Sequence, residues 1–109
     1  MPVDHRFSRA ARITRKSDFD QVFARPHTRM RQGPLRLLAL PNRMHGARLG
    51  LVVPKRVLKR AVDRNRAKRQ VRESFRLARP GLPAWDIVII VTGVGDVRQA
   101  ADQLWQRVQ

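Results

Sequence analysis

The sequence predicts an α+β fold in which helices pack on one small mixed β-sheet, giving a two-layer sandwich. Its length of 109 residues suits a single domain, and hydrophobic residues make up 42% of it, enough for a modest core. Segments with helical spacing of apolar residues alternate with short runs rich in aliphatic and β-branched residues. We therefore expect residues 1–109 to form one domain, with residues 1–12 as a basic N-terminal tail.

Residues 17–25 are predicted to form a short helix. Phe19, Val22 and Phe23 fall three and four residues apart and so share one helix face. Ser17 is expected to cap the start of the helix, and the proline that follows the segment ends it. The default role of such an apolar face is packing against a core.

Residues 34–40 and 48–53 are predicted to be strands, because both are mostly aliphatic and both are bounded by turn residues. The intervening segment, PNRMHG, supplies proline, asparagine and glycine, which favour a turn. We therefore expect these two strands to pair as an antiparallel hairpin. A further short strand is expected near 28–31.

The second half of the chain is predicted to be helix, strand, helix. Residues 63–79 form the first helix, with Asp63 as its expected N-cap. Residues 86–92, DIVIIVT, are predicted to be a buried strand because β-branched residues dominate. The last helix is expected to be capped by Asp96 and has the strongest helical spacing in the chain. Its apolar stripe comprises Val97, Ala100, Ala101, Leu104, Trp105 and Val108.

The charge of the chain points to a polyanionic partner. Lys and Arg total 24 against 8 Asp and Glu, a formal net charge of +16. Residues 55–79 hold 11 cations and 2 acids, whereas residues 80–109 hold 2 cations and 3 acids. Positive charge concentrated in this way is typical of proteins that bind DNA, RNA or an acidic membrane. The chain has no cysteine, which excludes disulfides and thiolate metal sites and fits a cytoplasmic location.

The helix predicted at 63–79 is expected to bury one flank and display cations on the next. At about 100° per residue, the buried arc holds Ala67, Val71, Ser74, Phe75 and Ala78. The adjoining arc, named here the cationic flank, holds Lys68, Arg69, Arg72, Arg76 and Arg79. Packing of the first arc would fix the second, so that its cations meet phosphates without further ordering of the backbone. A solvated surface helix is the alternative, but such helices usually interleave both signs of charge.

Several segments resemble the bacterial ribonuclease P protein family. RNRAKR at 64–69, with the arginines, glutamate and phenylalanine that follow it to residue 76, is similar to the RNR signature of that family. The segments RLGLVVPKR (48–56), SDFDQVF (17–23) and LPAWDIVIIV (82–91) are similar to its other elements. The match runs in the right order from about residue 6 to residue 107.

The resemblance implies an α-β-β-β-α-β-α order, with a left-handed β-α-β crossover that contains the RNR helix. It implies a protein subunit of an RNA-based endonuclease that removes the 5′ leader from precursor tRNA. Its partners would be the catalytic RNA and precursor tRNA, with no membrane and no small-molecule substrate. By matching position, the residues that contact the catalytic RNA would be Arg64, Asn65, Arg66, Lys68, Arg69 and Arg72. The cleft for the leader would be lined by Phe19, Phe23, Lys55 and Arg56.

The sequence departs from the family at two positions. Leu38 stands where relatives often have an aromatic residue, and Pro54 stands where they usually have a small or polar one. Leader binding is therefore expected to depend more on phosphate contacts and less on base stacking.

The polypeptide itself lacks the residues for phosphodiester cleavage. Metal-assisted hydrolysis needs clustered carboxylates, whereas the eight acids are scattered and the three histidines have no ligand spacing. We therefore expect no catalytic residue and no metal on the protein, with the Mg²⁺ ions of the reaction held by the RNA subunit. A structural rRNA-binding protein remains the alternative function. A membrane-active cationic helix is disfavoured because the buried arc of residues 63–79 is small.

Overall fold

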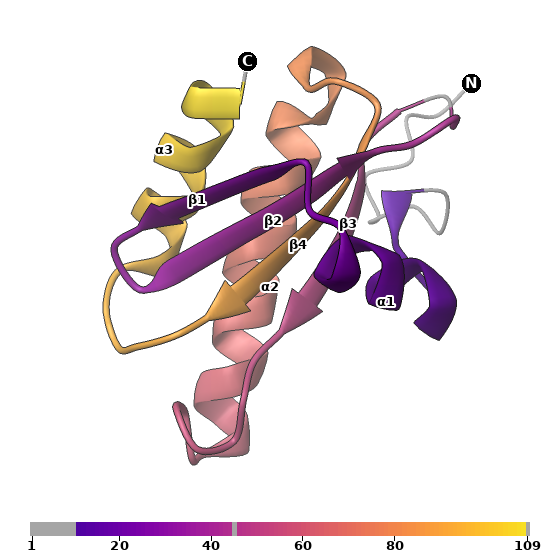
Figure 1. Ribbon diagram of the computed structural model, residues 1–109. Helices are drawn as coiled ribbons and strands as arrows, with labels where there is room; N and C mark the ends of the chain where they lie inside the picture. Colours follow the sequence, from indigo (N-terminus) through magenta and orange to yellow (C-terminus); the bar gives the residue numbers. More distant parts are fainter. Residues whose placement is uncertain (1–10, 45, 109) are drawn as a thin grey trace, which may run out of the picture.

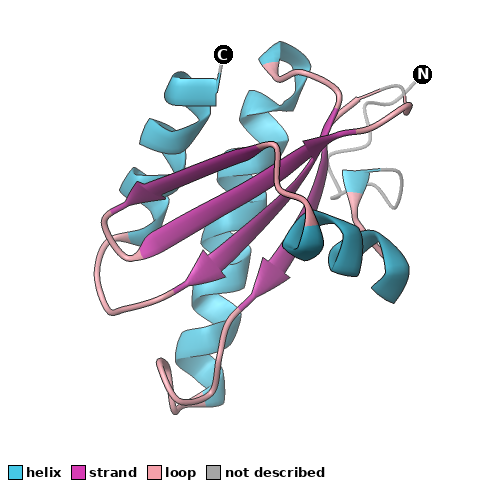
Figure 2. Cartoon of the chain, viewed as in Figure 1, coloured by secondary structure: helices cyan, strands magenta, loops and turns pink. Residues whose placement is uncertain are grey.

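The computed structural model describes residues 11–44 and 46–108, which form four strands, three α-helices and one short 3-10 helix (Figures 1 and 2). The elements in chain order are α1 (Lys16–Ala24), β1 (Thr28–Gln32), β2 (Leu35–Pro41), β3 (Arg48–Val52), α2 (Ala61–Ala78), η2 (Arg79–Gly81), β4 (Trp85–Val91) and α3 (Val97–Val108). The α-β-β-β-α-β-α order and the mixed sheet are confirmed, including the short first strand.

The strands lie in the order β1-β2-β4-β3, so the predicted pairing of residues 34–40 with 48–53 is wrong. β4 lies between β2 and β3, antiparallel to the first and parallel to the second. The hairpin is instead formed by β1 and β2, whose register pairs Gln32 with Leu35. Gly33 makes the turn possible because its φ of 52° lies in the left-handed region that glycine readily adopts.

The connection from β3 through α2 into β4 is a left-handed β-α-β crossover (Figure 1). This is the hand that the family resemblance implies, and it is opposite to the hand that such connections usually have. The crossover joins the edge strand β3 to its inner neighbour β4.

Two apolar clusters cover the two faces of the sheet. α2 and α3 lie on one face and α1 on the other (Figure 2). Alternation along β4 sends Ile87 and Ile89 into the main core beneath α2 and α3, while Val88 packs in a smaller cluster with Val22 of α1. The sheet with α2 and α3 forms the predicted two layers, and α1 covers part of the second face.

The helix starts were predicted with mixed success. α1 and α2 begin at Lys16 and Ala61, after Arg15 and Arg60, and neither start has a side-chain cap. Ser17 and Asp63 therefore lie inside the first turn and are not N-caps, which corrects both predictions. Asp96 is confirmed as the cap of α3, since its Oδ1 accepts a 3.0 Å hydrogen bond from the N–H of the third helical residue.

α2 and α3 are joined by a buried polar contact. The Nε1 of Trp105 donates a 2.8 Å hydrogen bond to the hydroxyl of Ser74, which donates in turn to Asp102. The Trp105 ring also meets Phe75 edge-on, with centroids 5.5 Å apart. These contacts explain why a serine is tolerated among the buried residues of α2.

The folded domain begins before α1. Ala11 is buried in the core and Arg12 forms a parallel β-bridge with Leu49, so both belong to the domain and not to the basic tail predicted for 1–12. Residues 1–10 of that tail lie outside the described residues. Among the residues described, no helix is long and apolar enough to cross a bilayer.

Candidate nucleic-acid interface

Three cations of the cationic flank point to solvent without a protein partner. Four of the five residues predicted for the buried arc are buried, namely Ala67, Val71, Ser74 and Phe75, whereas Ala78 at the end of α2 is half-buried. On the adjoining arc, the side chains of Lys68, Arg69 and Arg72 form no hydrogen bond or ion pair with any residue the structure describes. Arg69 and Arg72 are exposed and Lys68 is half-buried. Rigid, unpaired cations of this kind are suited to phosphate contacts.

The other two members of the cationic flank have structural roles. Arg76 Nη2 lies 2.6 Å from Glu73 Oε1, and this hydrogen-bonded pair lowers the pKa of Glu73 and raises that of Arg76. Arg79 donates a 2.8 Å hydrogen bond to the carbonyl of Ala47 and so ties the end of α2 to the segment before β3. The free part of the flank is therefore its first half.

The three residues of the RNR segment point in different directions. Arg64 Nη1 donates to the carbonyls of Leu58 (2.9 Å) and Lys59 (2.8 Å), which fixes the loop before α2. Asn65 is exposed on the side of the cationic flank. Arg66 is also exposed, but it lies on the other side of α2, where it lines a separate cavity. The six residues predicted to contact the catalytic RNA thus do not form one continuous row.

The cationic flank borders a small hollow beside α1. About 160 Å³ in volume, it is lined by Arg12, Ile13, Phe19, Leu49, Gly50, Leu51, Lys68 and Arg72. The Phe19 ring lies directly on the backbone of Gly50, where an added Cβ would be only 2.4 Å from its Cε1. Glycine is therefore required at this close approach. The contact brings an aromatic residue of α1 next to two cations of α2.

The two phenylalanines of α1 differ in exposure. Phe19 is half-buried against Gly50 and combines packing with a position at the hollow. Phe23 is 44% exposed, which leaves its ring accessible to a ligand. Lys55 and Arg56 are exposed in the turn between β3 and α2, beyond the end of the strand whose middle residue contacts Phe19. Of the four residues predicted to line the leader cleft, only Phe19 lines the hollow, and the other three line neither of the two cavities described, so the cleft remains a prediction.

Three arginines that the sequence pattern did not single out lie on the α1 face of the sheet. Arg29 pairs with Leu38, a member of the α1 cluster, which places Arg29 on that face. Arg31 pairs directly with Arg36 on the same face, although like charges in such positions repel each other. All three arginines are exposed. The signal was present, because Arg29 and Arg31 are two residues apart in a strand and so share a face.

Arg48 is a structural cation that holds α1 to the sheet. Its guanidinium donates two hydrogen bonds to the buried Asp86, at 2.8 and 2.6 Å, and lies 3.4 Å from Asp18 of α1. The Asp86 hydrogen bond is the main cause of a raised pKa of Arg48. Asn42 donates a further 2.9 Å hydrogen bond to Asp86. Most of the donors of Arg48 are thus used within the protein.

The acidic residues serve mainly as partners of cations. Lys16 pairs with Asp20, and Arg98 pairs with Asp102. Over residues 11–44 and 46–108, no three His, Asp or Glu side chains come together as a group that could hold a metal ion. What the described surface offers is cations and apolar side chains, a combination suited to binding single-stranded nucleic acid.

Comparisons with known proteins identify the family of this chain. The family model described as Ribonuclease P matches residues 7–109. The ribonuclease P protein component of Pasteurella multocida is 46% identical over 107 residues, covering 93% of this chain and 89% of that protein. The component of Halorhodospira halophila is 40% identical over 111 residues, covering 96% and 91%. The solved RNase P protein of Thermotoga maritima superposes with a TM-score of 0.76 at 29% identity, covering 90% of this chain and 97% of that one. The chain therefore belongs to the ribonuclease P protein family.

Proposed function

We propose that this protein is the protein subunit of ribonuclease P and that it assists removal of the 5′ leader from precursor tRNA. The observation that carries the proposal is the unpartnered row Lys68, Arg69 and Arg72, held on a helix whose neighbouring arc is buried. Membership of the ribonuclease P family supports it further. The partners are a catalytic RNA and precursor tRNA.

The cationic flank docks on the catalytic RNA. Its guanidinium and ammonium groups neutralise phosphates. Because packing of the buried arc already orders the backbone of α2, binding costs no further backbone entropy there. Asn65, Arg66 and the remaining donors of Arg64 take part at the start of the same helix. The leader passes by Phe23 and the hollow at Phe19, with phosphates near Lys55 and Arg56. Exposed Arg29, Arg31 and Arg36 widen the positive surface on that face.

Cleavage itself is assigned to the RNA. The acids of the described residues pair with cations or, for Asp96, cap a helix, and they do not gather at one point, so the protein contributes binding and charge neutralisation. Mg²⁺ ions held by the RNA subunit would supply the activated water and stabilise the leaving oxygen.

Reconstitution tests the proposal. The protein mixed with its catalytic RNA and labelled precursor tRNA should restore processing at low Mg²⁺, and the protein alone should cleave nothing. Arg69→Glu should weaken assembly with the catalytic RNA by about 10- to 100-fold, since it loses a charged contact and adds repulsion. Arg43→Glu is the matched control, because Arg43 is also an exposed arginine and lies in the loop after β2. Equal losses for both variants, or cleavage by the protein alone, would contradict the assignment.

The alternative, a structural rRNA-binding protein, predicts no dependence on the leader. In the reconstituted enzyme, affinity for precursor tRNA should exceed affinity for mature tRNA. Equal affinities would favour the alternative.

A further inference from the structure

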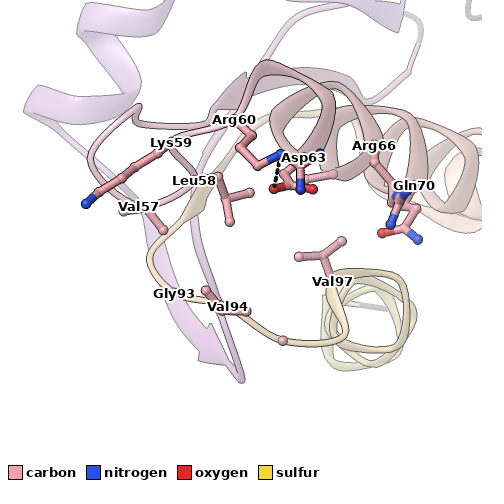
Figure 3. Close-up of a pocket in the computed structure, with 12 residues that line it drawn as sticks. Val57, Leu58, Lys59, Arg60, Asp63, Arg66, Gln70, Gly93, Val94 and Val97 are labelled. Atoms are coloured by element: carbon pink, nitrogen blue, oxygen red, sulfur yellow. Dashed lines mark ion pairs between the residues drawn. The ribbon is translucent and has the colours of Figure 1, made fainter.

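A second cavity lies on the side of α2 opposite the cationic flank (Figure 3). Its volume is about 590 Å³, within the range of sites that hold small ligands. Four segments form its walls: the loop before α2, the first turns of α2, the loop between β4 and α3, and the first residue of α3. It shares no lining residue with the hollow at Phe19.

The interior of this cavity is apolar and open. Leu58, Val94 and Val97 surround its centre in Figure 3, each from a different segment. Val94 is 85% exposed, the largest exposure among the large apolar residues described. Because this side chain is so exposed at the mouth of the cavity, a flat apolar ligand that covers it removes apolar surface from water, which favours binding.

The rim of the cavity is cationic. Lys59, Arg60 and Arg66 stand around it against a single acid, Asp63, which Arg60 reaches only at 4.0 Å. The side chains of Lys59 and Arg66 have no hydrogen-bond or ion-pair partner among the residues that the structure describes. The amide of Gln70 is likewise unpartnered and offers both a donor and an acceptor.

We propose that this cavity takes one unpaired nucleotide of the catalytic RNA. The base covers Leu58, Val94 and Val97, its edge meets Gln70, and the flanking phosphates meet Arg66 and Lys59. A ligand with a flat, partly apolar body and an anionic group satisfies both the interior and the rim. Only an unstacked base fits a single cavity, so the nucleotide comes from a bulge, loop or end.

The position of the cavity favours the catalytic RNA over the leader. It lies in the layer of α2 and α3, whereas Phe23 and the three sheet arginines lie on the α1 face (Figure 1). The cavity lies beside residues 63–70 of α2, and the cationic flank begins at Lys68 on the opposite side of the same helix, so one RNA can contact α2 from both sides. This inference rests on the proposed function and adds a base-binding site to its phosphate contacts.

Binding to the catalytic RNA in the absence of tRNA tests the proposal. Val94→Glu puts a negative charge at the mouth and should lower affinity at least tenfold, with unchanged thermal unfolding. Val94→Ser removes only the apolar contact and should lower affinity about threefold. The matched control is Met44→Glu, which makes the same change of charge at a residue that is 54% exposed in the loop after β2. Its affinity should stay within a factor of two of wild type.

Cross-linking identifies the occupant. Because the chain has no cysteine, Val94→Cys provides a unique site for a short photoreactive group. Adducts should concentrate on one or a few unpaired nucleotides of the catalytic RNA. Adducts on the leader of bound precursor tRNA, or wild-type affinity for Val94→Glu, would overturn the proposal. Arg69→Glu, measured in parallel, separates failure of the proposed function from failure of the cavity inference. If Arg69→Glu weakens assembly while Val94→Glu does not, the cavity inference fails and the proposed function stands.

Discussion

Replacement of Gly50 by alanine should destabilise the contact between α1 and β3. The added Cβ would lie 2.4 Å from Phe19 Cε1 and 2.6 Å from its Cζ, with Ile13 Cδ1 at 3.4 Å behind. The ring must therefore turn out of the hollow or push α1 from the sheet. Overpacking of this kind destabilises the folded state by about 1–3 kcal/mol. Replacing glycine by alanine also lowers the conformational entropy of the unfolded chain, which offsets about 0.4–1 kcal/mol of that loss. We expect a net loss of about 1–2 kcal/mol, or a fall in melting temperature of roughly 4–8 °C.

Urea and thermal unfolding of four proteins measure this effect: wild type, Gly50→Ala, Phe19→Ala and the double variant. The cost of Gly50→Ala should vanish in the Phe19→Ala background, because the ring that it strikes is gone. Gly93→Ala is the matched control, since no atom lies within 4 Å of a Cβ at that position and its φ is not positive. An equal cost of Gly50→Ala in both backgrounds would refute the role assigned to the Phe19 ring.

Three further outcomes are expected. Asp86→Asn should cost about 3 kcal/mol in urea unfolding because it leaves Arg48 half-buried without its main partner; a cost below 1 kcal/mol would show that Asp18 compensates. Glu73→Gln should release Arg76 and remove an acid from α2, so affinity for the catalytic RNA should rise a few-fold. The slope of log affinity against log salt concentration should steepen by about the amount expected for one phosphate contact. Unchanged affinity would place Arg76 outside the interface. Arg76 lowers the pKa of Glu73 in the folded protein. The stability that wild type has over Glu73→Gln should therefore be fully present above the ordinary carboxyl pKa, and it should be lost as pH falls through the lowered pKa of the folded protein. A stability difference that grows on acidification would contradict this sign.

The helices and the core could be predicted from local sequence, because their signals lie within a few residues. The stripe of α3 and its Asp96 cap are both confirmed. The buried arc of α2 is confirmed at four of its five residues, with Ala78 half-buried, since helical geometry alone decides which side chains share a face. The starts of α1 and α2 were misjudged because neither uses a side-chain cap, so Ser17 and Asp63 gave a false signal.

Strand pairing and the roles of individual arginines could not be predicted from local sequence. Nothing in the local sequence of β2 and β3 indicates whether they pair directly or have β4 between them. The position of β4 depends on residues far along the chain. In the same way, nothing near Arg64 in the sequence indicates that it would bond to the carbonyls of the preceding loop. Such contacts depend on the finished fold. The contacts of the six predicted RNA-binding residues with RNA remain predictions.

The strand order has a consequence for how the chain matures during its synthesis. Among the strands that the structure describes, β4 is made last and pairs with both β2 and β3. While the ribosome is still translating residues up to 84, β3 has no lateral neighbour among the other strands, and β2 has only β1. A nascent polypeptide arrested before that point cannot assemble the sheet, however complete its cationic helix is. Translation through β4, and not emergence of the cationic helix alone, therefore sets the earliest moment at which the complete sheet can form.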